Sequence, residues 1–227
     1  NMADVIASKP NADMYNRLLE RYCAPYPDRE GSITRQYNYE YDANVDTVFI
    51  KRFFSEKSQG GLSLIQTPAG KAVNGTLKYD PAWNAYYAGL NDQGGNIALQ
   101  KDMAVMMVPS DDAMNRYWEE GAGKVLRDYY GTWDNVPDDV ISKLINVNML
   151  SSFISSVPSK FDNILNDAND PMGVDIADID SVYLACNGAI YLTNKVYSPT
   201  AYISVSFPAL INETMRILYW GIEQLQY

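Results

Sequence analysis

Histidine is absent from the 227 residues of this chain, and its absence removes whole classes of chemistry. Serine and cysteine nucleophiles that rely on a histidine base cannot be built without it. The two cysteines, Cys23 and Cys186, are far apart and form no CxxC pair, so the usual zinc sites lack their ligands. We predict two separate buried thiols, with a disulfide as the alternative. We expect no metal, no cofactor and no catalytic residues.

Positive charge is also scarce. Lysine and arginine number 18 against 28 acids, for a net charge of −10, and they are scattered, which excludes a nucleic-acid partner. No apolar run reaches the roughly 18 residues of a membrane span, and no signal peptide is visible. Because the sequence begins at Asn1, we expect a processed or trimmed product whose targeting segment lies outside it. The 47% of hydrophobic residues suffices for a full globular core.

Hydrophobic periodicity outlines the first half of the chain. Residues 2–22 predict a helix broken by a turn, with Asn11 as the N-cap of its second part. The YNYEY segment, residues 37–41, alternates aromatic and polar residues and predicts a strand. Residues 48–54 and 62–65 predict two further strands, and Asn74-Gly75 predicts a tight hairpin turn.

The second half has clearer signals. AVMMV, residues 104–108, is a continuous apolar run that predicts a strand covered on both faces, followed by a helix from Ser110 to about Trp118. Another helix should open at Pro137-Asp138-Asp139. Residues 182–193 predict a hairpin of two alternating strands around Asn187-Gly188. A long C-terminal helix is predicted from the spacing of Ile211, Met215, Leu218, Ile222 and Leu225.

Adjacent acids are the first candidates for catalysis. Asp111 and Asp112 would point about 100° apart on a helix, whereas paired glycosidase carboxylates must flank one bond roughly 5 to 10 Å apart. We interpret them instead as first-turn residues that stabilise a helix capped by Ser110. Glu119-Glu120 and Asp138-Asp139 receive the same interpretation. In the acidic stretch 162–180, Pro171 occupies one ligand position of a calcium loop and the final glutamate is missing, so the stretch is interpreted as a solvated loop.

Aromatic residues are the other candidates. Eighteen tyrosines and four tryptophans are available, and such rings stack on sugars and serve as contact residues at interfaces. The alternative is that they only cover the core. Six of them lie in segments that predict loop or edge strand, and they are our candidate ligand-binding residues: Tyr37, Tyr39, Tyr41, Trp83, Tyr86 and Tyr87.

Two segments resemble those of one known family. Residues 103–114, MAVMMVPSDDAM, resemble the strand-to-helix segment of fasciclin-like domains, and residues 187–199, NGAIYLTNKVYSP, resemble their closing segment. The resemblance implies an α+β fold in which a β-sheet wedge or sandwich packs with several α-helices. It covers residues 1–205, with a long insertion at about 25–100. Residues 206–227 could begin a second such domain, since tandem copies are common in the family.

The chain also departs from the family. It lacks the tyrosine-histidine pair of some adhesive members, because it has no histidine, so integrin-type binding is not carried over. Asn194 replaces the family's usual aspartate near the end of the second segment. The Tyr-rich, acidic and enlarged form is most similar to exported, lipid-anchored proteins of gut-type Bacteroidetes.

These observations together predict a non-enzymatic, exported module that binds a protein or a glycan at the cell surface or in the periplasm. A neighbouring domain of the same precursor is an expected partner. We expect contact with the membrane only through a lipid anchor that lies outside this chain. The alternatives are a carbohydrate-binding component of a surface glycan-uptake system and a carboxylate-dependent hydrolase. The first requires coplanar aromatic rings on one exposed face, and the second requires two acids that converge in a cleft.

Overall fold

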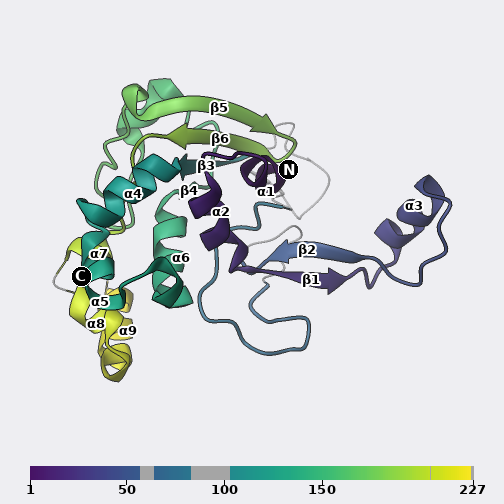
Figure 1. Ribbon diagram of the computed structural model, residues 1–227, viewed down its shortest axis with the longest axis horizontal. Helices are drawn as coiled ribbons and strands as arrows, with labels where there is room; N and C mark the ends of the chain where they lie inside the picture. Colours follow the sequence, from purple (N-terminus) through teal and green to yellow (C-terminus); the bar gives the residue numbers. More distant parts are fainter. Residues whose placement is uncertain (57–63, 83–102, 205, 226–227) are drawn as a thin grey trace, which may run out of the picture.

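A computed structural model describes residues 1–56, 64–82, 103–204 and 206–225. The chain is a mixed α and β protein with its strands in open sheets, which is compatible with the expected α+β class. Its main body combines one sheet with several helices, and a narrow arm extends away from that body (Figure 1). In the described ranges, no helix has both the length and the apolar character needed to cross a membrane.

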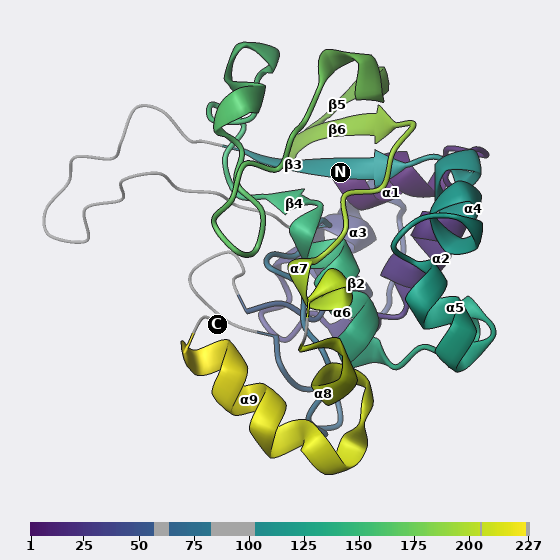
Figure 2. The same cartoon turned by 90° about the vertical axis from the view of Figure 1, so that its left-hand side faces the viewer.

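The main sheet has four strands in the order β4-β3-β6-β5. These strands are β3 (Ala104–Pro109), β4 (Met149–Leu150), β5 (Ile179–Ala185) and β6 (Gly188–Thr193). Strand β3 pairs in parallel with β6 and antiparallel with β4, so it lies inside the sheet (Figure 2). Every residue of β3 is buried, as the continuous apolar run predicted.

Helices cover one face of this sheet. They are α1 (Met2–Ala7), α2 (Asp13–Glu20), α4 (Asp111–Glu119) and α6 (Asp138–Val147). Their apolar residues form one core cluster with Met106, Val108, Ile190 and Leu192 of the sheet. The opposite face carries a smaller cluster in which Phe161 and Ile164 pack against Met107 and Tyr191. The predicted helix after Ser110 and the predicted helix start at Pro137-Asp138-Asp139 are both confirmed.

Asn11 does not cap α2, contrary to the prediction. The N-cap is Ala12, whose side chain makes no capping bond. The acceptor for this helix start comes instead from Asp111, whose Oδ1 accepts from the Met14 N–H at 2.8 Å. The Asn11 carbonyl in turn accepts from the Asp111 N–H at 2.8 Å, so the starts of α2 and α4 are joined by a pair of bonds.

The arm consists of β1 (Cys23–Pro27), α3 (Ser32–Glu40) and β2 (Phe49–Phe53). Its two strands pair antiparallel, and α3 forms the outer end (Figure 1). The predicted strand at 37–41 is therefore wrong: these residues lie in α3 and at its C-cap. Gly31, with φ of +69°, lets the chain turn into the helix, and hydrogen bonds around Asp28 override the strand preference of the tyrosines.

Residues 54–56 and 64–82 form no regular strand. The predicted strand 62–65 is reduced to an isolated bridge between Leu64 and Ser55, and residues 62 and 63 lie outside the described ranges. The predicted hairpin at Asn74-Gly75 is also absent. Gly75 does have a φ of +83°, but its role is close packing, because a Cβ there would lie 2.8 Å from the Asp138 carbonyl oxygen.

The predicted hairpin at 182–193 is confirmed, with two corrections. The turn residues are Cys186 and Asn187, since Ala185 pairs with Gly188. Strand β5 alternates between half-buried and exposed residues, but β6 is buried throughout because a core cluster covers each of its faces. Gly188 is required for packing, since a Cβ would lie 2.4 Å from Met2 Sδ and 2.5 Å from the Ala104 carbonyl oxygen.

The predicted long C-terminal helix is broken into several short elements. They are α8 (Phe207–Ile211), η5 (Glu213–Met215) and α9 (Arg216–Leu225), and a separate short helix, α7 (Thr200–Ile203), precedes them. The break falls at Asn212, whose Oδ1 accepts from both the N–H and the hydroxyl of Thr214, an alternative to continued helical bonding. Leu210 joins the main core, whereas Ile217, Leu218 and Trp220 are exposed.

The remaining elements are α5 (Lys124–Tyr130), η2 (Trp133–Asn135), η3 (Pro158–Asn163) and η4 (Ile176–Asp178). Both cysteines are free thiols. Cys23 is half-buried, and burial raises the pKa of its thiol to about 11. Cys186 is exposed at the β5–β6 turn, so the prediction that both thiols are buried is wrong for this residue.

Candidate functional site

The arm, residues 23–53, holds three of the six candidate aromatic residues. Tyr37, Tyr39 and Tyr41 are 41%, 89% and 67% exposed, in contrast to the buried tyrosines of the body such as Tyr15. The arm carries them to its outer end, away from the main sheet (Figure 1). An exposed cluster of large aromatic side chains on a protruding element is typical of a contact surface.

The helix changes how these tyrosines are grouped. On a strand, all three would share one face, because alternate residues point the same way. On a helix, residues four apart are neighbours, whereas residues two apart point about 200° away from each other. Tyr37 and Tyr41 accordingly lie together, with ring centroids 4.8 Å apart and planes tilted by 36°. Tyr39 projects from another side of α3.

Hydrogen bonds fix α3 on the end of the two strands. Asp28 Oδ2 accepts from the N–H of Thr34 at 2.7 Å and from its hydroxyl at 2.9 Å. The same hydroxyl oxygen accepts from the Val48 N–H at 3.2 Å, and the Asp28 N–H donates to the Val48 carbonyl at 3.0 Å. The helix start is thus tied to both strand ends, which restricts the orientation of the tyrosines.

A second set of hydrogen bonds joins α3 to the segment that follows it. The Asn38 side chain donates to the Val45 carbonyl and accepts from the Val45 N–H, both at 3.0 Å. This reciprocal pair bridges α3 and the segment that leads back to β2. Asp42 between them has a φ of +48°, the left-handed region that aspartate tolerates better than most residues.

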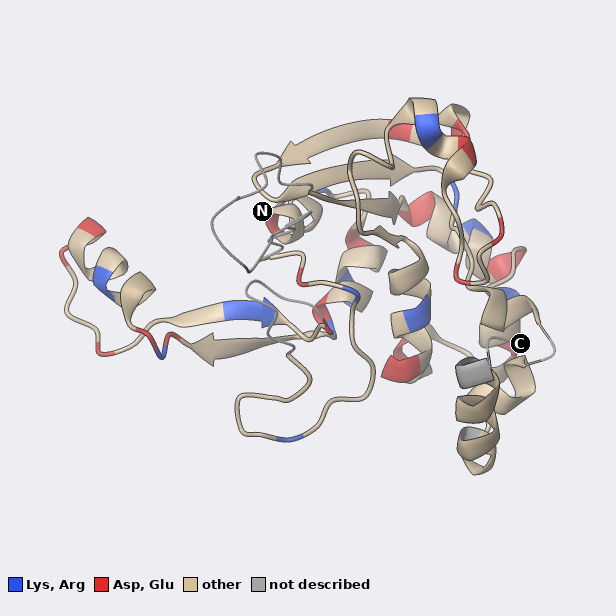
Figure 3. Ribbon diagram, turned by 180° about the vertical axis from the view of Figure 1, so that it is seen from behind, with Lys and Arg blue, Asp and Glu red and all other residues tan. Residues whose placement is uncertain are grey.

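The outer end of the arm is acidic. Residues 28–46 contain five acids, Asp28, Glu30, Glu40, Asp42 and Asp46, against two arginines, Arg29 and Arg35. Acidic positions follow the loops on both sides of α3 (Figure 3). The hydrogen bond from the Thr34 N–H lowers the pKa of Asp28, with help from the Thr34 hydroxyl and against the effect of burial. A negative charge at this position therefore belongs to the folded arm at neutral pH.

The inner end of the arm is fixed by a buried ion pair. Arg52 Nε lies 2.6 Å from Asp80 Oδ2, and the side chains are 16% and 0% exposed. Burial raises the pKa of Asp80, and the bond from Arg52 opposes that rise. Next to them Phe53 is fully buried, and the Phe54 N–H donates to the Tyr22 carbonyl at 2.7 Å. The arm therefore has a rigid attachment to the body.

The other candidate aromatics, Trp83, Tyr86 and Tyr87, lie outside the described residues. Sequence analysis missed one exposed aromatic residue of the arm, Phe49, which is 68% exposed on β2. Strand alternation places Phe49, Lys51 and Phe53 on one face of β2, but Phe49 and Lys51 are exposed on the arm whereas Phe53 is buried where β2 meets the body. The period of two therefore could not have separated the exposed Phe49 from the buried Phe53.

The adjacent acids have separate roles. Asp111 accepts a hydrogen bond from the Met14 N–H, and Asp112 is exposed. A cavity of about 340 Å³ lies among Asp134, Asp138 and Asp139. Arg21 donates to Asp138 with 2.8 Å from Nε to Oδ1, and Arg17 lies 3.2 Å from Asp134. Two of these three carboxylates are thus bound to guanidinium groups.

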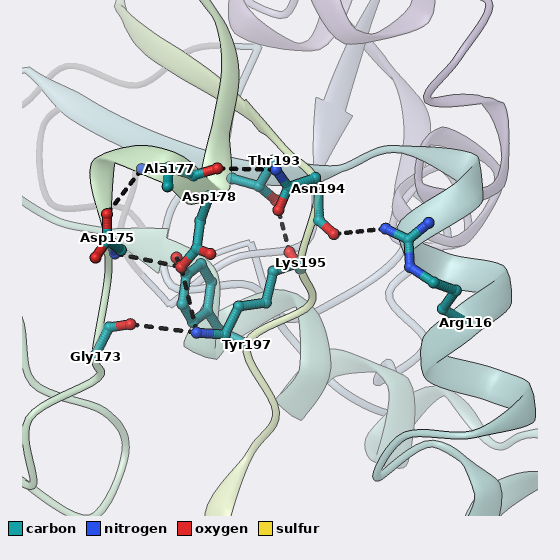
Figure 4. Close-up of polar contacts among 9 residues, drawn as sticks. All are labelled: Arg116, Gly173, Asp175, Ala177, Asp178, Thr193, Asn194, Lys195 and Tyr197. Carbon is teal, nitrogen blue, oxygen red and sulfur yellow. Dashed lines mark hydrogen bonds and ion pairs between the residues drawn. The ribbon is translucent and has the colours of Figure 1, made fainter.

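The acidic stretch 162–180 forms hydrogen bonds with the segment that follows β6 (Figure 4). Asp178 Oδ2 accepts from the Tyr197 hydroxyl at 2.9 Å and from Lys195 Nζ at 3.2 Å. These bonds lower the pKa of Asp178 despite its partial burial, and burial beside Asp178 raises the pKa of Tyr197. The tyrosine stays protonated and acts as a donor.

Asn194, at the position where the resemblance implied an aspartate, belongs to the same network. Its N–H donates to the Asp178 carbonyl at 2.9 Å, and its carbonyl accepts from Arg116 of α4 at 2.8 Å (Figure 4). Asp167 accepts from the Thr200 N–H and so begins α7. Asp167 and Asp178 therefore organise loops, and most aspartates of the stretch are exposed, as expected for a solvated loop. Within the described residues, no group of three or more histidine, cysteine or acidic side chains is arranged to hold a metal.

Comparison of the chain with protein-family models, with curated proteins and with solved structures found no match.

Proposed function

We propose that this chain is a non-enzymatic binding module that uses the end of its arm to recognise a macromolecule at a cell surface. The observation that carries the proposal is the exposure of Tyr37, Tyr39 and Tyr41 on a helix fixed at the end of a protruding arm. A fixed scaffold lowers the conformational entropy lost on binding, and tyrosine offers a large contact area with few rotatable bonds.

The geometry supports a protein partner better than a glycan. Sugar stacking favours open, coplanar rings on one face. Here Tyr37 and Tyr41 are tilted against each other by 36° and cover part of each other, and Tyr39 lies on another side of the helix. Such a surface is convex and aromatic on several sides, and it is suited to insertion into a groove on a protein. Glycan binding in an uptake system is the second candidate, because the remaining aromatic candidates lie outside the described ranges.

The family and the location are part of the proposal. The buried strand β3, the Ser110 cap and the segment after Asn187 support a fasciclin-like domain, in which residues 25–100 form an insertion and the arm is its outer part. With this assignment, we place the protein outside the cytoplasm, at the cell surface or in the periplasm. Attachment through a lipid anchor would come from outside this sequence.

The test separates the two partner classes. The purified chain is applied to a glycan array and to a plate of purified extracellular-matrix proteins, with Trp83→Ala as the glycan control. We expect saturable binding to a protein on the plate that Trp83→Ala leaves unchanged. Binding confined to the glycan array and lost in Trp83→Ala would overturn the proposal in favour of the uptake component.

A further inference from the structure

Strand β5 forms an open edge of the main sheet. Within the described ranges its one strand partner is β6, and it lies at the outer side of the sheet in both views (Figures 1 and 2). An edge strand presents unpaired backbone donors and acceptors to solvent. The five residues 181–185 contain neither a charge nor a proline, two devices that commonly protect such edges.

The exposed face of β5 is apolar. Val182 and Leu184 are 53% and 74% exposed, and their partners on β6 are Tyr191 and Ala189 of the smaller core cluster. The register shifts between Ile179 and Ser181, so Asp180 is a bulge residue. The bulge keeps Ile179 on the same face as Val182 although they are three residues apart.

A cavity continues this apolar face. It has a volume of about 360 Å³ and is lined by Ile179, Val182, Tyr191, Phe161, Pro158 and Ile176. Ile176 at its rim is 68% exposed. The cavity is large enough for an aliphatic side chain from a strand laid beside β5, because such a strand directs alternate side chains to this face.

Acidic residues gather at the beginning of β5. Residues 158–180 contain six aspartates against one lysine. Figure 3 shows these charges at one end of the strand, whose remaining length is uncharged. Lys195 neutralises Asp178, whereas Asp180 accepts a hydrogen bond from the amide group of Asn194, at 3.4 Å, and forms no ion pair with the described residues. A basic residue beside the apolar segment of a ligand would complement this end.

A second copy of the chain fits this edge poorly. Each copy carries a net charge of −10, and antiparallel self-pairing centred on Val182 would place Asp180 of each strand opposite Leu184 of the other. The acids would gain no basic partner. We therefore propose that β5 binds an extended peptide segment with apolar residues at alternate positions and a basic residue beside them, which adds as a fifth strand.

The test uses a fluorescein-labelled peptide in which valine and threonine alternate, with lysines at both ends. Fluorescence anisotropy measures its binding to the full chain, and hydrogen exchange measures protection of residues 179–185. We expect saturable binding of the peptide and protection of these amides. The control is the same peptide with alternate amides N-methylated. Because each methyl group removes a backbone donor, we expect the control to bind at least about tenfold more weakly. Equal binding of the methylated peptide, or no protection of β5, would overturn the proposal.

Variants locate the site. Val182→Thr/Leu184→Thr keeps strand propensity, and we expect about tenfold weaker binding, whereas the control Ile217→Thr on α9 leaves binding unchanged. Asp180→Lys should weaken binding of the lysine peptide about threefold and strengthen a glutamate-ended one. The same peptide should bind Tyr37→Ser/Tyr41→Ser normally, so the outcome is independent of the role of the arm. Analytical ultracentrifugation tests for self-association. If the chain formed concentration-dependent dimers and the peptide dissociated them, a second copy would be the occupant and the proposal would be overturned.

Discussion

The carboxylate of Asp111 accepts a hydrogen bond from the backbone N–H of Met14, with 2.8 Å between oxygen and nitrogen. Asp111 begins one helix and caps another, since it is also the first residue of α4. The bond joins residues that are 97 positions apart in sequence. An acid that resembled half of a catalytic pair is thus a link between α2 and α4.

Replacement of Asp111 tests this structural role. We expect Asp111→Ala to lower the free energy of unfolding by about 1 kcal/mol, the usual cost of a lost N-terminal cap. The exposed neighbour Asp112 supplies the control, and Asp112→Ala should cost only about 0.3 kcal/mol through the helix dipole. Urea denaturation followed by circular dichroism measures both, and equal losses would contradict the assigned role.

The pair of Arg52 and Asp80 should be important for stability. Arg52→Met leaves the fully buried carboxylate of Asp80 without its cation, and we expect a loss of about 3 kcal/mol or more. The adjacent exposed pair of Lys51 and Glu20 is the matched control, so Lys51→Met should cost less than about 1 kcal/mol. Thermal and chemical denaturation compare the two variants. Similar losses would show that the burial of Asp80 is not decisive.

The end of the arm should respond to acid. The pKa of Asp28 is lowered in the folded chain by the Thr34 N–H, so its contribution to stability is present above the unfolded value of about 3.9. That contribution is lost as the pH falls through the lower folded pKa. The amide resonance of Thr34, followed by NMR from neutral pH downward, should titrate with a midpoint below about 3.9. The titration should vanish in Asp28→Asn, and a midpoint above that value would contradict the assignment.

The strand β3 and the helix α4 could be predicted because their signals are local. A continuous run of five apolar residues, 104–108, and a serine followed by two acids each specify one structure without reference to distant parts of the chain. The same holds for the start of α6 at Pro137-Asp138-Asp139. The predicted capping role of Asn11 failed because its replacement, Asp111, is distant in sequence, and no local pattern announces such an acceptor.

The segment YNYEY shows the opposite case. Its five residues alternate between aromatic and polar, which is typical of a strand. The same residues are also compatible with the last turns of a helix whose start is fixed by Asp28 and Thr34. The pattern was too short to separate the two periods. The exposure of Tyr37, Tyr39 and Tyr41 was anticipated by their placement in an edge segment, whereas their division between sides of α3 was not.

The binding role of the arm is the central claim, and one comparison tests it most directly. The chain, Tyr37→Ser/Tyr41→Ser and Tyr129→Ser are titrated on the plate of purified extracellular-matrix proteins. Tyr129 is 58% exposed on α5, so it controls for the loss of an exposed ring elsewhere. The account predicts at least about tenfold weaker binding for the arm variant alone, as for a contact residue at the centre of an interface. Equal affinities of all three proteins, or no binding of the unaltered chain to any protein on the plate, would contradict it.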